Sequence, residues 1–434
     1  MKRLCVLLVL LLAAGPLSAQ DTTQFREGVR VGVDYVPGTR PGLVVLPGPG
    51  LDSVRAMVRR DLDYSDRFEM IQVDDAPPGD AGAGPVNYGI YKTLGAQLAV
   101  ELVEAASGVT ARLHDLTASK VRNQQTVGLP GGTDPGYRLQ VHQLADEITR
   151  WASGTPGVAA TRFLFVSGGR VYQVDSDGSN LLPLTPDGVT ALSPTWSPDG
   201  QRFAYTKLEG GRGGVLVQAL AGGAPQVAPG PASGLNITPV FAPDGRTLAY
   251  AHSDESGTDI YTANVADRCC AQRLTVGRYA DNLSPTFSPD GRRIAFVSTR
   301  AGPPQIYVMA ADGTDQELLA PFDYGATGPS NAPEWSPDGA NVVFHRDVSR
   351  SPQLFLVDVA GRRVRQLTSA GRNEDPTWAP DGRHIAFISD RSGRRQIWII
   401  DMETGRVRQL QTPGAARLPS WSRRLGRTAV VPNP

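Results

Sequence analysis

Cysteine is scarce in this 434-residue chain, which contains only Cys5, Cys269 and Cys270. Cys5 lies in the N-terminal apolar segment, and two adjacent cysteines close a strained ring at best, so no disulfide framework holds the fold together. Histidine is scarce as well, with five residues scattered along the sequence. Because neither a His-Glu-x-x-His motif nor a spaced Cys/His cluster is present, the sequence argues against a zinc site.

An excess of charge of either sign is also missing. Lys plus Arg and Asp plus Glu each number 43, so the overall charge predicts binding neither to nucleic acid nor to an anionic membrane surface. Beyond residue 19 there is no run of 18 uninterrupted apolar residues. We therefore expect a chain that does not span a membrane.

The common catalytic motifs are missing too. There is no Gly-x-Ser-x-Gly nucleophile elbow, and Gly48-Pro-Gly50 lacks the Lys-Ser/Thr that completes a phosphate-binding loop. The sequence therefore predicts a protein that is not an enzyme.

The first nineteen residues have the three parts of an export signal. Lys2 and Arg3 are followed by an apolar run over residues 4–14 that is too short to span a bilayer comfortably, and small residues end the segment at Ala19. This pattern predicts a signal peptide over residues 1–19, cleaved near Ala19, and an exported protein.

One pattern recurs along the C-terminal two thirds of the chain. It combines a proline, an aromatic residue and a Pro-Asp-Gly turn, and its aromatic residues fall 45, 46, 48, 43 and 43 positions apart. Such a period is typical of one four-stranded propeller blade. The copies are Ser193 to Gly200, Thr238 to Gly245, Ser284 to Gly291, Ala332 to Gly339, Asp375 to Gly382 and a truncated copy from Leu418 to Ser422.

Each unit predicts four strands. In Ser-Pro-Asp-Gly the proline presets φ, the aspartate bonds the local backbone and the glycine takes a positive φ, so the unit forms a hairpin turn. Alternating or wholly apolar runs follow, as at residues 292–298 and 305–309. Residues 162–185 supply later strands without a first one, and residues 418–421 supply the missing strand. Pairing of the two would close a ring of six blades and remove its open edges.

Residues 21 to about 155 show no trace of this repeat. Apolar runs predict strands at residues 43–46 and 68–73 and a hairpin around Ser107-Gly108, whereas residues 51–62 and 137–151 have helical spacing. The predicted fold is thus mainly β: a six-bladed β-propeller preceded by a small α/β domain. Its parts are a signal peptide (1–19), an extended arm (20–42), the α/β domain (43–155) and the propeller (158–434).

This order of segments, with its repeated Ser-Pro-Asp-Gly turns, resembles the TolB family, the periplasmic propeller proteins of the Tol-Pal cell-envelope system. The resemblance implies a periplasmic scaffold that supports envelope integrity and cell division. It implies binding of the peptidoglycan-associated lipoprotein Pal to the propeller and of the inner-membrane protein TolA to the N-terminal arm. We expect a monomer without nucleic acid. Gly32 departs from the family pattern, since a β-former is usual there.

The resemblance also assigns binding residues. The arm that would contact a TolA-like protein is Val29, Arg30, Val31, Gly32, Val33 and Asp34. The surface that would contact a Pal-like protein consists of the loops entering the first strands, namely Leu235, Asn236, Ile237, Thr238, Asp281, Asn282, Leu283, Ser284, Asn331, Ala332, Asn373, Glu374 and Asp375.

Two observations on these loops leave alternatives open. Four loops carry Asn, which can donate and accept hydrogen bonds to a protein segment but often serves only its own backbone. No cofactor is predicted, although carbonyls and acidic side chains at the channel mouth would suit a single calcium ion. The alternative function is an exported enzyme or glycan binder that uses the central channel.

Overall fold

The computed structural model describes residues 40–73, 86–266, 270–277, 280–322 and 328–426. The predicted signal peptide and residues 29–34 of the predicted arm lie outside these residues. Cys270 is disulfide-bonded. None of the helices in the described part of the chain is both long and apolar enough to cross a membrane.

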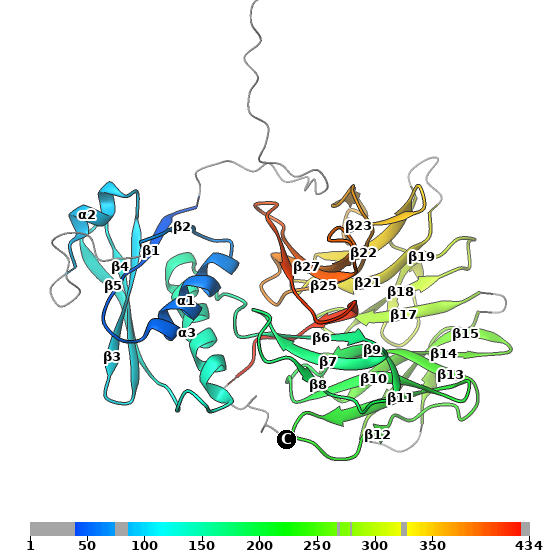
Figure 1. Cartoon of the computed structure of the whole chain (residues 1–434). Coiled ribbons are helices and arrows are strands. Elements are labelled where there is room, and N and C mark those ends of the chain that lie inside the picture. The colour runs from blue at the N-terminus through cyan, green and yellow to red at the C-terminus, as the bar shows by residue number, and fades with distance from the viewer. Residues whose placement is uncertain (1–39, 74–85, 267–269, 278–279, 323–327, 427–434) are drawn as a thin grey trace, which may run out of the picture.

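The N-terminal part is a five-stranded sheet with helices on both faces (Figure 1). Leu43 and Val45 of the strand at residues 42–45 pack against the two long helices, and Val44 packs on the opposite face beside the short helix. This alternation follows from the two-residue period of a strand. In the order β2-β1-β3-β4-β5 the strands are β2 (Glu69–Ile71), β1 (Gly42–Val45), β3 (Leu98–Ala105), β4 (Gly108–Asp115) and β5 (Lys120–Gly128), and the helices are α1 (Asp52–Tyr64), α2 (Tyr88–Thr93) and α3 (Gly136–Ser153).

The C-terminal part is a β-propeller of antiparallel sheets arranged around a centre (Figure 1), so the predicted mainly-β class is confirmed. One four-stranded sheet combines β29 (Arg417–Trp421) with β6 (Arg162–Ser167), β7 (Arg170–Asp175) and β8 (Leu182–Pro183). Three more contain β17 (Asn282–Phe287), β18 (Arg293–Ser298), β19 (Gln305–Ala310) and β20 (Glu317–Leu318); β21 (Ser330–Trp335), β22 (Asn341–Val348), β23 (Ser351–Asp358) and β24 (Val364–Gln366); and β25 (Asn373–Trp378), β26 (His384–Ser389), β27 (Gln396–Asp401) and β28 (Val407–Leu410).

The remaining propeller sheet has eight strands. It contains β9 (Thr190–Trp196), β10 (Arg202–Glu209), β11 (Arg212–Ala219), β12 (Gln226–Val227), β13 (Leu235–Phe241), β14 (Thr247–Asp254), β15 (Gly257–Asn264) and β16 (Gln272–Arg273). Strand pairing joins its two halves at one point, where Gly213 of β11 pairs with Leu235 of β13. Strand pairing thus yields four separate four-stranded sheets and one of eight strands, and the predicted number of six blades remains a prediction.

The first strands contact one another in a closed circle. β9 contacts β13, followed in turn by β17, β21, β25 and β29, and β29 contacts β9 again. The circle closes because β29 pairs antiparallel with β6, with Trp421 opposite Phe163. This confirms the predicted pairing of the last strand with the first sheet.

Trp421 is the main side chain at this closure. Its ring lies 4.4 Å from that of Phe163, centroid to centroid, and its indole Nε1 donates to Thr161 Oγ1 at 2.8 Å. Only 6% of the residue is exposed. Closure is therefore stabilised by buried apolar area as well as by the backbone pairing.

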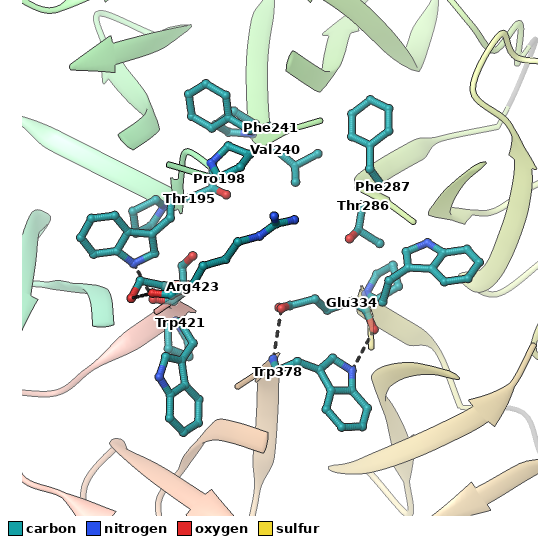
Figure 2. A pocket seen from close by; sticks show the side chains of 18 of the residues that line it. Thr195, Pro198, Val240, Phe241, Thr286, Phe287, Glu334, Trp378, Trp421 and Arg423 are labelled. Atoms are coloured by element: carbon teal, nitrogen blue, oxygen red, sulfur yellow. Dashed lines mark hydrogen bonds between the residues drawn. The ribbon is translucent and has the colours of Figure 1, made fainter. Parts of the chain in front are cut away.

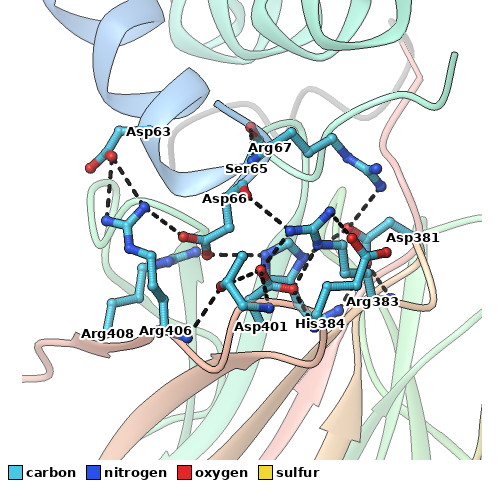
Figure 3. A network of polar contacts seen from close by, with 12 residues as sticks. Asp63, Ser65, Asp66, Arg67, Asp381, Arg383, His384, Asp401, Arg406 and Arg408 are labelled. Carbon is cyan, nitrogen blue, oxygen red and sulfur yellow. Dashed lines mark hydrogen bonds and ion pairs between the residues drawn. The ribbon is translucent and has the colours of Figure 1, made fainter. Parts of the chain in front are cut away.

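A polar network joins the α/β part to the propeller (Figure 3). His384 of β26 lies between two carboxylates, with Nδ1 2.8 Å from Asp381 and Nε2 3.2 Å from Asp66, which follows α1. Arg383 donates to the backbone oxygen of Asp66 at 2.9 Å, and Arg406 lies 2.7 Å from its carboxylate. Burial disfavours the charged imidazole, but Asp381 and Asp66 outweigh that cost and raise the pKa of His384 to about 9.

A second cluster joins helix α3 to the first propeller sheet. The buried carboxylate of Asp177 pairs with both Arg60 and Arg138. His142 lies beside it, with Nδ1 2.7 Å from Asp61. Burial opposes protonation of His142, but Asp61 and Asp177 raise its pKa. Buried charges thus join the α/β part to the propeller at two places. One is on the sheet of β25 to β28, and the other is on the sheet that contains β29 and β6 to β8.

We predict that Trp421→Ala lowers the free energy of unfolding by about 3–5 kcal/mol, the usual cost of truncating a buried aromatic residue. Trp421→Phe should cost only about 1 kcal/mol, because it removes mainly the hydrogen bond to Thr161. Urea denaturation followed by circular dichroism measures both. Equal, small effects of the two substitutions would contradict a role of Trp421 in closing the circle.

The network around His384 predicts a pH dependence. Because its pKa is higher in the fold than the value of 6.5 for a free imidazole, charged His384 contributes its full stabilisation below pH 6.5, and that contribution is lost as the pH rises through about 9. His384→Gln should therefore flatten the decline of stability between these pH values, by up to about 3 kcal/mol.

Thermal unfolding of the His384→Gln variant across this pH range provides the measurement. His345→Gln is the matched control, because burial lowers the pKa of His345 to about 4 and keeps it neutral throughout. An unchanged pH dependence in the His384 variant would show that His384 is not charged in the folded protein.

Candidate functional site

The first strands of the propeller surround a central channel (Figure 2) with a cavity of about 840 Å³. Equivalent positions of the repeat line it, from the residue that precedes the first proline to the proline of the Ser-Pro-Asp-Gly turn. This follows from the circle of contacts, because each first strand presents the same positions to the centre. The repeat thus builds a concave channel, and such features are the usual ligand sites of a fold.

The upstream ring of the channel has an unusual backbone. The residue before each first proline has a positive φ of 48° to 51°, at Ser193, Thr238, Ser284, Ala332, Asp375 and Leu418. At this point each first strand gains one residue relative to its second strand, as between Ile237 and Val240. The extra residue is a β-bulge, which bends the strand and turns side chains toward the centre. A positive φ is strained for a β-branched residue such as Thr238.

An aromatic ring follows three positions further along each strand. Trp196 donates through Nε1 to the backbone oxygen of Ser420 at 3.1 Å, and Trp378 donates to that of Glu334 at 3.3 Å. In both cases the acceptor lies on the preceding first strand of the circle. Trp196 and Trp378 thus connect neighbouring first strands around the channel. The six aromatic residues are Trp196, Phe241, Phe287, Trp335, Trp378 and Trp421.

Glu334 is the acidic side chain in the middle of the channel wall (Figure 2). Its Oε1 accepts the backbone N–H of Trp378 at 3.1 Å and the hydroxyl of Thr377 at 3.2 Å. Burial outweighs these hydrogen bonds and raises the pKa of Glu334 to about 7. The channel therefore holds a carboxyl group that titrates near neutral pH.

Asp375 lies in the upstream ring and is also shielded from water. Its carboxylate accepts the N–H of Leu418 at 3.4 Å, and burial raises its pKa. Its own N–H donates to Nδ1 of His345 at 3.2 Å, a bond that requires an unprotonated nitrogen. This agrees with the lowered pKa of His345. The two acidic residues that line the channel thus occur on neighbouring strands.

Two asparagines predicted to contact a partner are buried. Asn282 and Asn373 are both 0% exposed. The Asn282 amide donates to Asp259 at 3.0 Å, and its oxygen accepts from Ser298 at 2.8 Å. The Asn373 amide donates to Gln353 at 2.9 Å, and its oxygen accepts from Arg391 at 2.7 Å. These side chains join one sheet to the preceding one, so in this structure they face the interior rather than a partner.

The other predicted loop residues divide into groups. Asn236 is half-buried and its oxygen bonds His252 at 2.8 Å, while Ile237 and Leu283 pack against the core between sheets. Leu235 is half-buried at the pairing of the two halves of the eight-stranded sheet. Thr238, Ser284, Ala332 and Asp375 line the channel.

Three predicted residues are more accessible. Asp281 is exposed and Asn331 is half-buried. Glu374 is 17% exposed at its side chain and lies 3.0 Å from Arg395. Some of the loop residues predicted from the sequence therefore face the channel or solvent, and the others fill the spaces between sheets.

Two channel residues were missed from the sequence, Glu334 and Arg423. Both occupy repeat positions where other copies carry a different residue: Thr, Val or Ser at the position of Glu334, and Pro at that of Arg423. Comparing the copies at these positions would have found both. Turn and strand signals alone do not find them, because Glu334 lies in the strand before the turn and Arg423 lies just beyond the truncated copy, which ends at Ser422.

Two groups could offer ligands to a metal ion among the described residues: Asp66, His384 and Asp401, and His142, Asp175 and Asp177. Both belong to the contacts between the α/β part and the propeller rather than to the channel. The guanidinium of Arg383 forms an ion pair with the carboxylate of Asp401, with an N–O distance of 2.6 Å, and arginines also pair with Asp66 and Asp177. Because each group is already neutralised by guanidinium ions, we interpret both as ion-pair networks.

We predict that Asn373→Ala lowers the free energy of unfolding by about 1–3 kcal/mol, because it removes the buried hydrogen bonds that Asn373 makes with Gln353 and Arg391. Asn331→Ala, at a half-buried residue in the neighbouring first strand, should change it by less than about 0.5 kcal/mol. Chemical denaturation of both variants tests this. A neutral Asn373→Ala would contradict the structural role of that amide.

The sequence matches a family model described as the TolB beta propeller domain, over residues 151–322 and 324–432. Among curated relatives, the Tol-Pal system protein TolB of Bordetella avium is 31% identical over 229 residues, which cover 50% of this chain and 49% of that protein. The protein of the same name from Haemophilus influenzae is 29% identical over 247 residues, covering 52% and 56%. The matches to the curated relatives thus span about half of their length.

The solved structure of TolB from Acinetobacter baumannii superposes with a TM-score of 0.77 at 22% identity, and covers 91% of this chain and 100% of that one. This likeness confirms the fold, an α/β part followed by a propeller. The family model covers well over half of the sequence, including every strand of the propeller. The chain therefore belongs to the TolB β-propeller family.

Proposed function

We propose that this chain is a non-catalytic periplasmic scaffold of the Tol-Pal system, which binds a Pal-like lipoprotein through its propeller and a TolA-like protein through its N-terminal arm. The main support for this proposal is a channel built from equivalent positions of the family repeat. The mouth of this channel is formed by the loops entering the first strands. The curated relatives of this propeller are named as Tol-Pal system proteins.

We further propose six blades and the domain division 1–19, 20–42, 43–155 and 158–434. Counting each half of the eight-stranded sheet as one blade gives six four-stranded units, and this supports the number. The domain division is supported by the end of α3 at Ser153 and the start of β6 at Arg162. The export signal over residues 1–19 supports a periplasmic location.

The proposed partner surface combines the upstream ring with its accessible neighbours. Thr238, Ser284, Ala332 and Asp375 line the channel, Asp281 directly precedes β17, and Asn331 and Glu374 lie at the starts of β21 and β25. Asn282 and Asn373 support this surface from inside by joining adjacent sheets. The arm at residues 29–34 stays assigned to the TolA-like partner on the family resemblance.

The alternative of a channel enzyme or glycan binder has less support. The carboxyl groups that line the channel are those of Glu334 and Asp375, and both accept backbone N–H groups. We propose no cofactor beyond a single calcium ion at the channel mouth, for which Asp375 would supply a carboxylate oxygen. We also propose that the protein acts as a monomer.

Calorimetry with the purified Pal-like domain of the same organism tests the proposal. Saturable binding is expected, and the double substitution Asn331→Ala and Glu374→Ala should weaken it at least about fivefold, because it truncates two polar side chains at the channel mouth. Deletion of residues 20–34 should leave this affinity unchanged and abolish binding of the TolA-like protein. No binding of the Pal-like domain to the intact chain would refute the proposed function.

A further inference from the structure

The ring of prolines at the downstream end of the channel is interrupted by one arginine. Five copies of the repeat have Pro directly after the turn's first residue, and the sixth copy has Arg423. All six line the channel: Pro198, Pro243, Pro289, Pro337, Pro380 and Arg423. The sixth copy thus replaces a rigid apolar residue by a long cationic one at a position that the repeat directs to the centre.

The backbone on both sides of Arg423 is fixed. The N–H of Ser422 donates to Arg162 at 2.8 Å, and the N–H of Leu425 donates to Ala160 at 2.9 Å. Leu425 is 5% exposed and packs with Leu139 of α3. The tail after β29 is therefore held between the propeller and the α/β part, which determines where the side chain of Arg423 points.

That side chain extends from the wall into the middle of the channel (Figure 2). Within the described residues its guanidinium has no hydrogen bond and no ion pair. The adjacent Arg424 differs, because its Nε donates to the backbone oxygen of Gly157 at 2.7 Å. Glu334 lies two first strands away along the circle, and its Oε1 accepts from Thr377 and Trp378. Arg423 is thus a cation in a protein-lined channel with its donors available.

Two further polar atoms of the channel wall have no partner in the described structure. Nε1 of Trp335 and Oγ1 of Thr238 are buried without a hydrogen bond. The equivalent indoles of Trp196 and Trp378 both donate to backbone oxygens. A buried donor without an acceptor is rare in a finished interior, but both atoms are shielded as the wall stands, so the proposal rests on Arg423.

We propose that Arg423 binds a carboxylate carried by an extended protein segment that enters the channel. A guanidinium and a carboxylate form a charge-assisted, bidentate pair, and arginine is well suited to this recognition. The inference rests on the proposed function as a protein-binding scaffold and names the chemistry that the channel selects. From the upstream ring to Arg423 the wall runs over five residue steps, or roughly 16 Å at the rise of a strand. About five extended residues of a partner therefore span it.

The test uses three synthetic peptides titrated into the intact chain at low ionic strength, followed by the fluorescence of the channel tryptophans. The first is acetyl-Gly-Ser-Gly-Ser-Ala with a free terminal carboxylate, and the second is its amide. The third, acetyl-Gly-Ser-Gly-Ser-Asp amide, carries the carboxylate on a side chain instead. At least one of the two acids should bind about tenfold more tightly than the neutral amide, and whichever acid binds identifies the source of the carboxylate.

Arg423→Gln should remove this difference, and Arg423→Lys should retain most of it. Arg424→Gln is the matched control and should leave it unchanged, because Arg424 is bonded to the backbone. The inference is overturned if both acids bind no better than the amide, or if the preference persists in Arg423→Gln. Because these peptides need no natural partner, a failure here is distinct from a failure of the Pal-like domain to bind.

Discussion

A single pair of strands from distant parts of the sequence closes the propeller. β29 near the C-terminus pairs with β6, the first strand after the α/β part, and Trp421 buries its ring against Phe163. Without this pairing, β6 would have an open edge, which invites association with other chains, and β25 would lose its contact with β29. Every property of the channel depends on closure, because its wall exists only when all first strands face one centre.

The α/β part contacts the propeller next to this closure. Its contacts reach the sheet of β26 through Asp66 and the sheet of β6 through Arg60, Arg138 and His142. The tail between Ser422 and Leu425 adds a third contact, with α3 on one side and the channel on the other. Buried ion pairs of this kind contribute little net stability but penalise any arrangement that separates the partners. The two parts are therefore held in one relative position, and the tail that carries Arg423 is held with them.

The sequence predicted most of the elements because local signals specify them. The Pro-Asp-Gly turns marked the hairpin between the first and second strands of five units, and helical spacing marked α1 and α3. It did not predict β5, whose residues are mostly polar and exposed at the sheet edge and so lack an alternating apolar pattern, or the short helix α2.

The site was harder to predict for a related reason. The asparagines of the loops looked available because a sequence does not show what lies opposite a side chain. Asp259 and Gln353, which bond Asn282 and Asn373, come from the preceding sheet. The bulge that turns Thr238 and Asp375 into the channel also arises from tertiary pairing, since a residue before proline has no local preference for a positive φ.

The proposed function places a protein partner at the channel formed by the first strands. Amide hydrogen exchange of the intact chain, with and without the Pal-like domain, tests it most directly, because it locates protection along the sequence. Binding at the channel should add protection in the segments that enter β13, β17, β21 and β25, with little change in the outer strands β12, β16, β20 and β24. Protection confined to those outer strands, or to the sheet of the α/β part, would contradict it.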